Sequence, residues 1–281
     1  MLLIALAVAT SSLVVGCGAS NKKAKNPTKF TRSPFNVAKF VDPRLGGNRW
    51  FPLKPGMQFV RKGTTLIGNR AVPHAVVTTV TDVIRTINGV KAVLVYDHSE
   101  GAGQVVQQSL DYFAQEKGGA IWYLGSTTEQ YEAGRFVAVD EAWLAGAKGA
   151  KAGILMPANP TAATPPWTIA QPSGEKGDAA EFARMQPKQC VPYDCFTNVL
   201  VVREGKKTAL DNELKYYADG VGQIRNQPRS DSRHDDIEWL TNVTRLSSAG
   251  LAEASKEAMR IDAEAAKAFP KIYGTTRPTR A

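Results

Sequence analysis

Apolar and polar residues alternate over short segments along most of residues 50–246. These segments are rich in Val, Ile, Thr, Tyr and Trp and are separated by Gly, Asn, Asp and Pro, which is typical of antiparallel strands and their turns. The dipeptide Asn88-Gly89 separates two of them, and Asn-Gly favours the positive φ angles of a tight hairpin. We therefore predict a mainly β body: one antiparallel curved sheet, half-barrel or sandwich.

Two further hairpins are predicted from the same pattern. Residues 116–119 join the segments SLDYFAQ and AIWYLG, and a later turn joins TNVLVVRE to ELKYYAD. One face of a late strand carries apolar residues and the other carries polar ones, as in a half-buried strand: Ile237, Trp239, Thr241 and Val243 against Glu238, Asn242 and Thr244. The alternation is imperfect in residues 75–87, where Val76 and Val77 both look inward, and a bulge would explain it.

Two regions depart from the strand pattern. Residues 144–178 are rich in Gly, Ala and Pro and predict a long loop with edge-strand pieces across one mouth of the sheet, a common place for functional sites. Residues 248–269 predict a helix that ends at Pro270, because small apolar residues recur at steps of three and four. Its apolar stripe consists of Leu251, Ala254, Ala258, Ile261, Ala265 and Ala268.

The N-terminus predicts export and lipid attachment. Residues 2–16 are apolar and uncharged, as in the core of a secretory signal. Residues 14–17 read VVGC and resemble the lipobox of bacterial lipoprotein precursors, whose cysteine accepts a diacylglyceryl group. The absence of Lys or Arg near Met1 departs from that pattern and suggests a start further upstream. The alternative is an ordinary signal peptide with a chance cysteine at Cys17.

These patterns predict five segments: a signal peptide (1–16), a lipid anchor at Cys17 with a flexible tether (17–48), an antiparallel β domain (49–246), a helix (247–270) and a disordered tail (271–281). The chain would then lie on the extracytoplasmic side of a bacterial membrane, on either the inner or the outer one. The membrane is its predicted partner through the lipid.

The net charge of +9 and the pI near 9.4 raise the possibility of a nucleic-acid partner. The basic residues are scattered and form no Lys/Arg-rich helix, so we predict no nucleic-acid binding. Lipidation of Cys17 would leave Cys190 and Cys195 as an even pair. Four residues between them are too many for a thioredoxin-type motif, and we predict a structural disulfide.

Five runs resemble a group of exported bacterial lipoproteins of unassigned function: WFPLKPGMQFV, DYFAQEKGGAIWYLG, GILMPANP, VPYDCFTNVLVVRE and YYADGVGQI. The resemblance covers about residues 50–225. It implies an all-β body, such as the curved half-barrel of lipoprotein-carrier domains, and nothing about activity. Asp194-Cys195 replaces a usual Gly-rich turn, and Ser126 replaces an acidic residue that often follows the W-Y-x-G motif.

No sequence motif for catalysis stands out: G-x-S-x-G, P-loop, H-E-x-x-H and C-x-x-C are all absent. His74, His98 and His234 are too far apart in sequence to suggest a metal site, so we predict no metal, cofactor or catalytic residue. Turn and strand-end carboxylates are the open question, because two that converge would form an acid–base pair or a cation site. They are Asp97, Glu100, Asp111, Asp140, Glu141 and Asp219.

Aromatic and Met residues of the hairpins and the long loop are either core or the wall of an apolar ligand site. The candidates for ligand binding are Trp122, Tyr123, Trp143, Met156 and Trp167. We therefore hypothesise a non-catalytic protein that binds an apolar, lipid-like ligand or an envelope protein. The alternatives are a structural envelope protein whose sheet is filled by its own side chains, and a carboxylate-dependent hydrolase.

Overall fold

The computed structural model describes residues 33–45, 47–67, 70–175, 177–206, 209–228, 236–274 and 276–280. The signal peptide, Cys17 and His234 lie outside these ranges, so lipid attachment stays a prediction. Among the described residues, no helix combines the length and the apolar character needed to cross a membrane.

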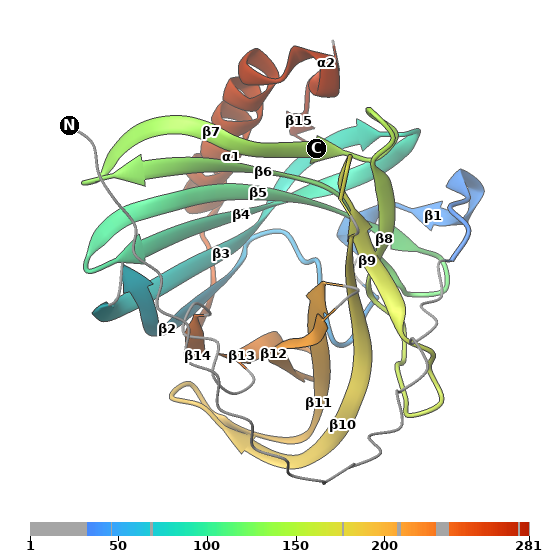
Figure 1. The fold of residues 1–281 in the computed structure, drawn as a ribbon, viewed down its shortest axis with the longest axis vertical. Helices are drawn as coiled ribbons and strands as arrows, with labels where there is room; N and C mark the ends of the chain where they lie inside the picture. The colour runs from blue at the N-terminus through green and yellow to red at the C-terminus, as the bar shows by residue number, and fades with distance from the viewer. Residues whose placement is uncertain are drawn as a thin grey trace, which may run out of the picture.

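The described chain is built mainly from strands (Figure 1). The strands are β1 (Phe40–Val41), β2 (Met57–Ile67), β3 (Arg70–Ile87), β4 (Val90–Gly101), β5 (Gln104–Glu116), β6 (Ile121–Glu132), β7 (Arg135–Leu144), β8 (Lys151–Met156), β9 (Trp167–Gln171), β10 (Asp178–Cys190), β11 (Cys195–Lys206), β12 (Ala209–Ala218), β13 (Gly222–Pro228), β14 (Ile237–Arg245) and β15 (Thr279–Arg280). The helices are α1 (Ser248–Ala268) and α2 (Pro270–Tyr273), with single 3₁₀ turns η1 (Val37–Lys39) and η2 (Pro43–Leu45).

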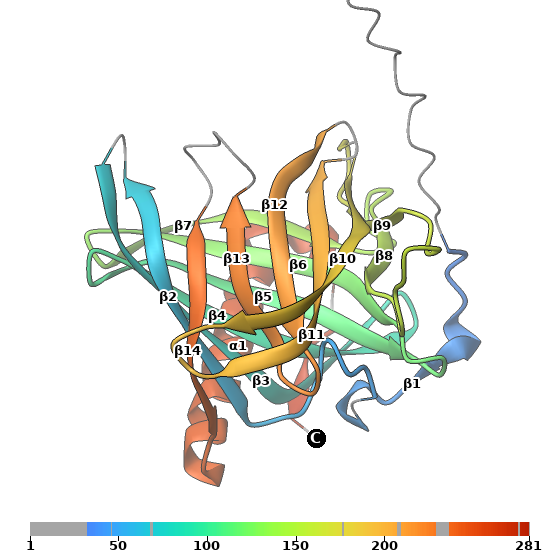
Figure 2. The ribbon, with the colours of Figure 1, turned by 90° about the horizontal axis from the view of Figure 1, so that it is seen from below.

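Within the described residues, twelve strands, β2–β6 and β8–β14, close into an antiparallel barrel. β6 makes the closure possible. Its residues 121–130 pair with β5, and on its other side residues 121–123 pair with β8 and residues 125–132 pair with β7. The mainly β fold with a C-terminal helix is confirmed. The sheet is closed, and Figures 1 and 2 show β3–β6 and β10–β14 as its opposite walls.

The three predicted hairpins are present as β3–β4, β5–β6 and β11–β12. Asn88 and Gly89 adopt φ angles of 48° and 79°, as the predicted turn requires. The irregularity predicted within residues 75–87 is present, although the pairing of Val76 and Val77 with β4 is itself regular. The irregularity follows Val80 instead, where the Thr81 hydroxyl bonds to the Leu94 carbonyl oxygen at 2.7 Å.

Residues 144–178 contain the predicted strand pieces between loops, and two of these pieces, β8 and β9, belong to the barrel wall. β8 and β9 pair with each other, and they connect β6 to β10. The approach of β8 to β9 is close: a Cβ added to Gly153 would lie 2.4 Å from the Thr168 carbonyl oxygen. The glycine that made this segment look like a loop is therefore what lets two strands meet.

α1 lies on the outside of the β3–β6 wall (Figure 1). The predicted helix is confirmed, with Ser247 as its N-cap and Ala258, Ile261 and Ala265 buried. The sequence pattern did not reveal Asp262, which is fully buried and accepts hydrogen bonds from Arg85 of β3 at 2.6 and 2.9 Å. The helix is therefore fixed to the sheet by a buried ion pair as well as by its alanines.

Both ends of the described chain pack against the barrel, where the sequence predicted a tether up to residue 48 and a disordered tail. Phe35 and Phe40 contact Trp122 edge-to-face, with ring centroids 5.6 Å apart in each pair. At the other end β15 pairs with β3, and the Arg280 guanidinium lies 2.7 Å from a carboxylate oxygen of Asp82. Aromatic burial and a charge pair order these polar segments.

Candidate functional site

The barrel encloses a cavity of about 550 Å³. Because successive side chains of a strand point to opposite faces, a strand that runs along the cavity contributes every second residue to its wall. β3 contributes His74, Val76, Thr78 and Val80 in this way. The cavity is of the size that proteins commonly use to bind small molecules.

The cavity wall is mixed in character. Its apolar part includes Phe51, Phe59, Val80, Val95, Phe113, Leu155 and Val221. Its ionisable part consists of Arg61, His74, Asp97, Asp111, Glu213, Lys215, Asp236 and Glu238. Carboxylates outnumber the basic side chains in this lining, so the interior favours positive charge.

The first half of β14 shows where alternation misled the prediction of which strand face is buried. Glu238 and Leu240 are buried, with 7% and 0% of their surfaces exposed, whereas Ile237 and Trp239 are only half-buried. From the sequence, the apolar residues were expected to face inward, because the inner face of an antiparallel sheet is usually packed on a hydrophobic core. Over residues 237–240 the inside is a polar-lined cavity, so the expected orientation is reversed there. Beyond the irregularity after Leu240, Asn242 and Thr244 are exposed and Val243 is half-buried, as the alternation predicts.

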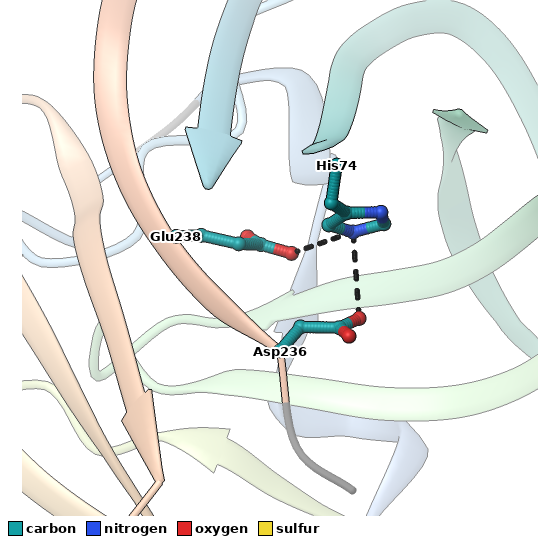
Figure 3. Close-up of side chains that lie close together, drawn as sticks. All are labelled: His74, Asp236 and Glu238. Atoms are coloured by element: carbon teal, nitrogen blue, oxygen red, sulfur yellow. Dashed lines mark ion pairs between the residues drawn. The ribbon is translucent and has the colours of Figure 1, made fainter. Parts of the chain in front are cut away.

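His74, Asp236 and Glu238 converge at one place on the cavity wall (Figure 3). His74 Nε2 lies 3.4 Å from Asp236 Oδ2 and 3.3 Å from Glu238 Oε1. The other ring nitrogen, Nδ1, lies 2.9 Å from the Glu100 carbonyl oxygen, which can only accept a hydrogen bond. The ring is therefore held from both sides.

The charges of this group favour one another. Burial opposes the charged imidazole, but Glu238 and Asp236 outweigh it and raise the pKa of His74. Burial also opposes the charged form of Glu238, yet His74 and Arg61 lower the pKa of that carboxyl to about 2. Arg61 Nε donates to Glu238 Oε2 at 3.0 Å.

Asp97 and Asp111 form a second polar region of the cavity. Burial raises the pKa of the Asp97 carboxyl, and Arg61 and Thr78 only partly oppose it. Burial and the charge of Asp97 raise the pKa of Asp111 to about 6, against hydrogen bonds from Tyr123 and Ser126. Neighbouring carboxyls whose pKa values are raised in a cavity are typical of functional sites.

Lys215 is the remaining base of the lining, and it is already paired. Its Nζ lies 2.7 Å from Glu204 and 3.0 Å from Glu213. Burial opposes its charge, but these two carboxylates raise the pKa of Lys215 well above its usual value. Lys215 therefore stays positively charged without any ligand.

The five candidate aromatic and Met residues are buried or half-buried, and none is among the residues that line the cavity: Trp122, Tyr123, Trp143, Met156 and Trp167. Tyr123 comes nearest, because its hydroxyl donates to Asp111 Oδ1 at 2.5 Å and Trp143 packs on its ring. A ligand role for the five stays a prediction. Cys190 and Cys195 are joined by a disulfide at the β10–β11 turn, as predicted.

Among the predicted carboxylates, Asp97 and Asp111 line the same cavity. Glu100 lies 3.2 Å from His98, Asp219 pairs with Arg49 on the surface, and Asp140 and Glu141 lie on β7. The sequence analysis missed Arg61, Asp236 and Glu238. The sequence did contain a signal for Glu238, because it is a charged residue between apolar neighbours on β14. We expected its side chain to face solvent.

Two solved structures show a distant likeness to this chain. A candidate exported protein with a YmcC-like fold from Bacteroides fragilis is 12% identical, with a TM-score of 0.38. A candidate lipoprotein from Parabacteroides distasonis is 14% identical, with a TM-score of 0.34. Each match covers 70% of this chain and 99% of the other protein. No family model and no curated protein matches the chain.

Proposed function

We propose that this chain is a lipid-anchored binding protein of the bacterial cell envelope, which holds a small amphipathic molecule inside its barrel without catalysis. The observation that carries the proposal is the cavity, which is lined by both apolar and ionisable side chains. An interior filled by its own side chains would have supported a purely structural role instead.

The ligand that fits this wall has an apolar body and a cationic group. Among the described residues, Arg61 and Lys215 are each paired with a carboxylate, whereas no salt bridge reaches Asp97 or Asp111. A cation beside these two carboxyls would stabilise their ionised forms, which burial disfavours. The valine and phenylalanine side chains nearby supply the contact for the apolar body.

A matched pair of amphiphiles tests this proposal. Octyltrimethylammonium and octyl sulfate carry the same chain and opposite charges, so their binding to the purified protein by calorimetry separates the apolar from the electrostatic contribution. We expect the cation to bind and the anion to bind at least ten-fold more weakly. Equal binding of the two, or binding of neither, would contradict the cationic class.

Neighbouring valines provide the control for location. Val76 points into the cavity, whereas Val77 is not among its lining residues. Val76→Phe should therefore abolish binding of octyltrimethylammonium, and Val77→Phe should leave it within two- to three-fold. Native mass spectrometry of the protein as purified would identify a bound natural ligand by an adduct that denaturation removes.

A carboxylate-dependent hydrolase is the second candidate, favoured by Asp97 and Asp111 in one cavity. This activity would consume the bound molecule, so incubation with extracts of envelope lipids should give products that the Asp97→Asn variant does not form. Release of an unchanged ligand on denaturation would support the binding role over this one.

A further inference from the structure

His74, Asp236 and Glu238 present three donor atoms to one point on the cavity wall (Figure 3). These atoms, one imidazole nitrogen and two carboxylate oxygens, all lie within 4.8 Å of one another. Asp236 and Glu238 are close in sequence at the start of β14, and β2 lies between them and His74 of β3. The barrel closure therefore assembles the group.

The imidazole turns Nε2 toward the two carboxylates, and a metal ion bound there would displace the proton from this nitrogen. Its Nδ1 faces the Glu100 carbonyl oxygen, an acceptor, and so carries a proton. Nε2 points at the carboxylates, and within the described chain no hydrogen bond of good geometry reaches it. The His74 side chain is only 5% exposed, so a buried ring nitrogen is left without a hydrogen-bond partner, which is rare in folded proteins.

The groups around the cluster hold its ligands in place. Arg61 donates to Glu238 Oε2, which leaves Oε1 as the oxygen that faces His74. Asn226 Nδ2 donates to the Asp236 backbone carbonyl oxygen at 3.2 Å. Outer contacts of this kind orient the ligands of protein metal sites.

We propose that His74, Asp236 and Glu238 bind one divalent first-row transition-metal ion of the Zn²⁺ type. In a tetrahedral site with bonds of about 2.0–2.2 Å, neighbouring ligand atoms lie about 3.3–3.6 Å apart. The two distances from His74 Nε2, 3.3 and 3.4 Å, have this spacing. The mixture of one nitrogen and two oxygens suits Zn²⁺ better than Ca²⁺ or Mg²⁺, which prefer oxygen alone.

Three protein ligands would leave one coordination position open to the cavity, which is the arrangement of reactive or exchangeable metal sites. This inference goes beyond the proposed function, because the metal needs no organic molecule in order to bind. A failure of the amphiphile experiment leaves it intact, and the reverse is also true.

Titration with Zn²⁺ alone tests the proposal on the full chain, purified without a histidine tag and stripped of metal. Calorimetry should give one ion per chain. His74→Gln and Glu238→Gln should each weaken binding at least ten- to 100-fold. His98→Gln is the matched control, because this histidine also lies beside a glutamate but outside the cluster, and it should change the affinity less than three-fold.

Cobalt supplies a readout that does not depend on the variants folding. Co²⁺ added to the unmodified protein should give the visible absorption bands of a four- or five-coordinate site, and Zn²⁺ should remove them. Absence of stoichiometric binding, or binding that survives both His74→Gln and Glu238→Gln, would overturn the proposal. So would nitrogen NMR showing that His74 keeps protons on both ring nitrogens in excess Zn²⁺, as an imidazolium paired with the two carboxylates.

Discussion

At the scale of single residues, the barrel interior is notable for two aspartates with raised pKa values. Asp97 and Asp111 face the cavity from neighbouring strands, and the pKa of each is raised, first of all by burial. A carboxyl that is easier to protonate in the folded than in the unfolded chain destabilises the fold once it ionises. Stability alone would not favour aspartates at these two positions. This supports the proposal that Asp97 and Asp111 bind a ligand.

Asp111→Asn should therefore stabilise the protein at neutral and alkaline pH but not at pH 4. The folded-state pKa is about 6 and the ordinary value is 3.8, so the native state binds the extra proton between these pH values. The contribution of the Asp111 carboxyl to the free energy of unfolding is fully present below about pH 4 and is lost as the pH rises through 6. Because Asp111 is only partly shielded from cavity water, we expect a gain on the order of 2 kcal/mol at pH 8 and little at pH 4.

Urea unfolding at the two pH values measures this difference. Asp219→Asn, a change to an aspartate at the surface, serves as the control and should show no comparable gain. An equal effect of Asp111→Asn at pH 4 and pH 8 would mean that ionisation of Asp111 is not the cause.

At the scale of elements, one glycine of β2 determines how two other strands meet. Gly63 pairs with His74 of β3 on one side and with Glu238 of β14 on the other. A Cβ added to Gly63 would lie 1.6 Å from the Ile237 carbonyl oxygen, far inside van der Waals contact. The missing side chain allows β14 to come close and lets His74 and Glu238 meet above the glycine.

Gly63→Ala should consequently separate β14 from β2. We expect a loss of at least about 2 kcal/mol in the free energy of unfolding, because the backbone has to shift to make room. Zn²⁺ binding should be lost with it. Gly118→Ala is the control, since nothing lies within 4 Å of its added Cβ; a Gly63→Ala protein as stable as this control would refute the packing argument.

At the scale of the whole molecule, α1 is joined to the barrel through charges that are completely buried. Arg85 and Asp262 both have side chains with 0% exposure, and Tyr112 donates to the same carboxylate at 2.9 Å. Arg85 also donates to the Tyr273 carbonyl oxygen of α2 at 2.8 Å. One arginine of β3 thus holds both helices on the outer wall.

Asp262→Asn should destabilise the protein by roughly 3–5 kcal/mol, because it leaves the buried Arg85 without its counter-charge. Thermal unfolding followed by circular dichroism measures the change. Glu253→Gln, on the exposed side of the same helix, should alter stability by less than about 0.5 kcal/mol. Similar effects of the two substitutions would show that the ion pair does not hold the helix.

The sequence by itself determined the local structure of this protein. Asn88-Gly89, the glycines near residue 118 and the spacing of alanines in α1 act over a few residues, so the hairpins and the helix were predictable. The Cys190–Cys195 disulfide was predictable for the same reason, since a pair five residues apart closes across one turn. The predictions of a signal peptide and of lipid attachment also rest on local sequence.

Only the tertiary structure decided which face of each strand is enclosed and what that enclosure contains. Alternation along β14 separates Glu238 from Ile237 and Trp239 but does not say which side is inside, and the cavity reversed the usual answer. His74 and Glu238 are far apart in sequence and meet only because β2 lies between them in a closed barrel. Closure is a property of all the strand pairings together, so no local pattern encodes this site.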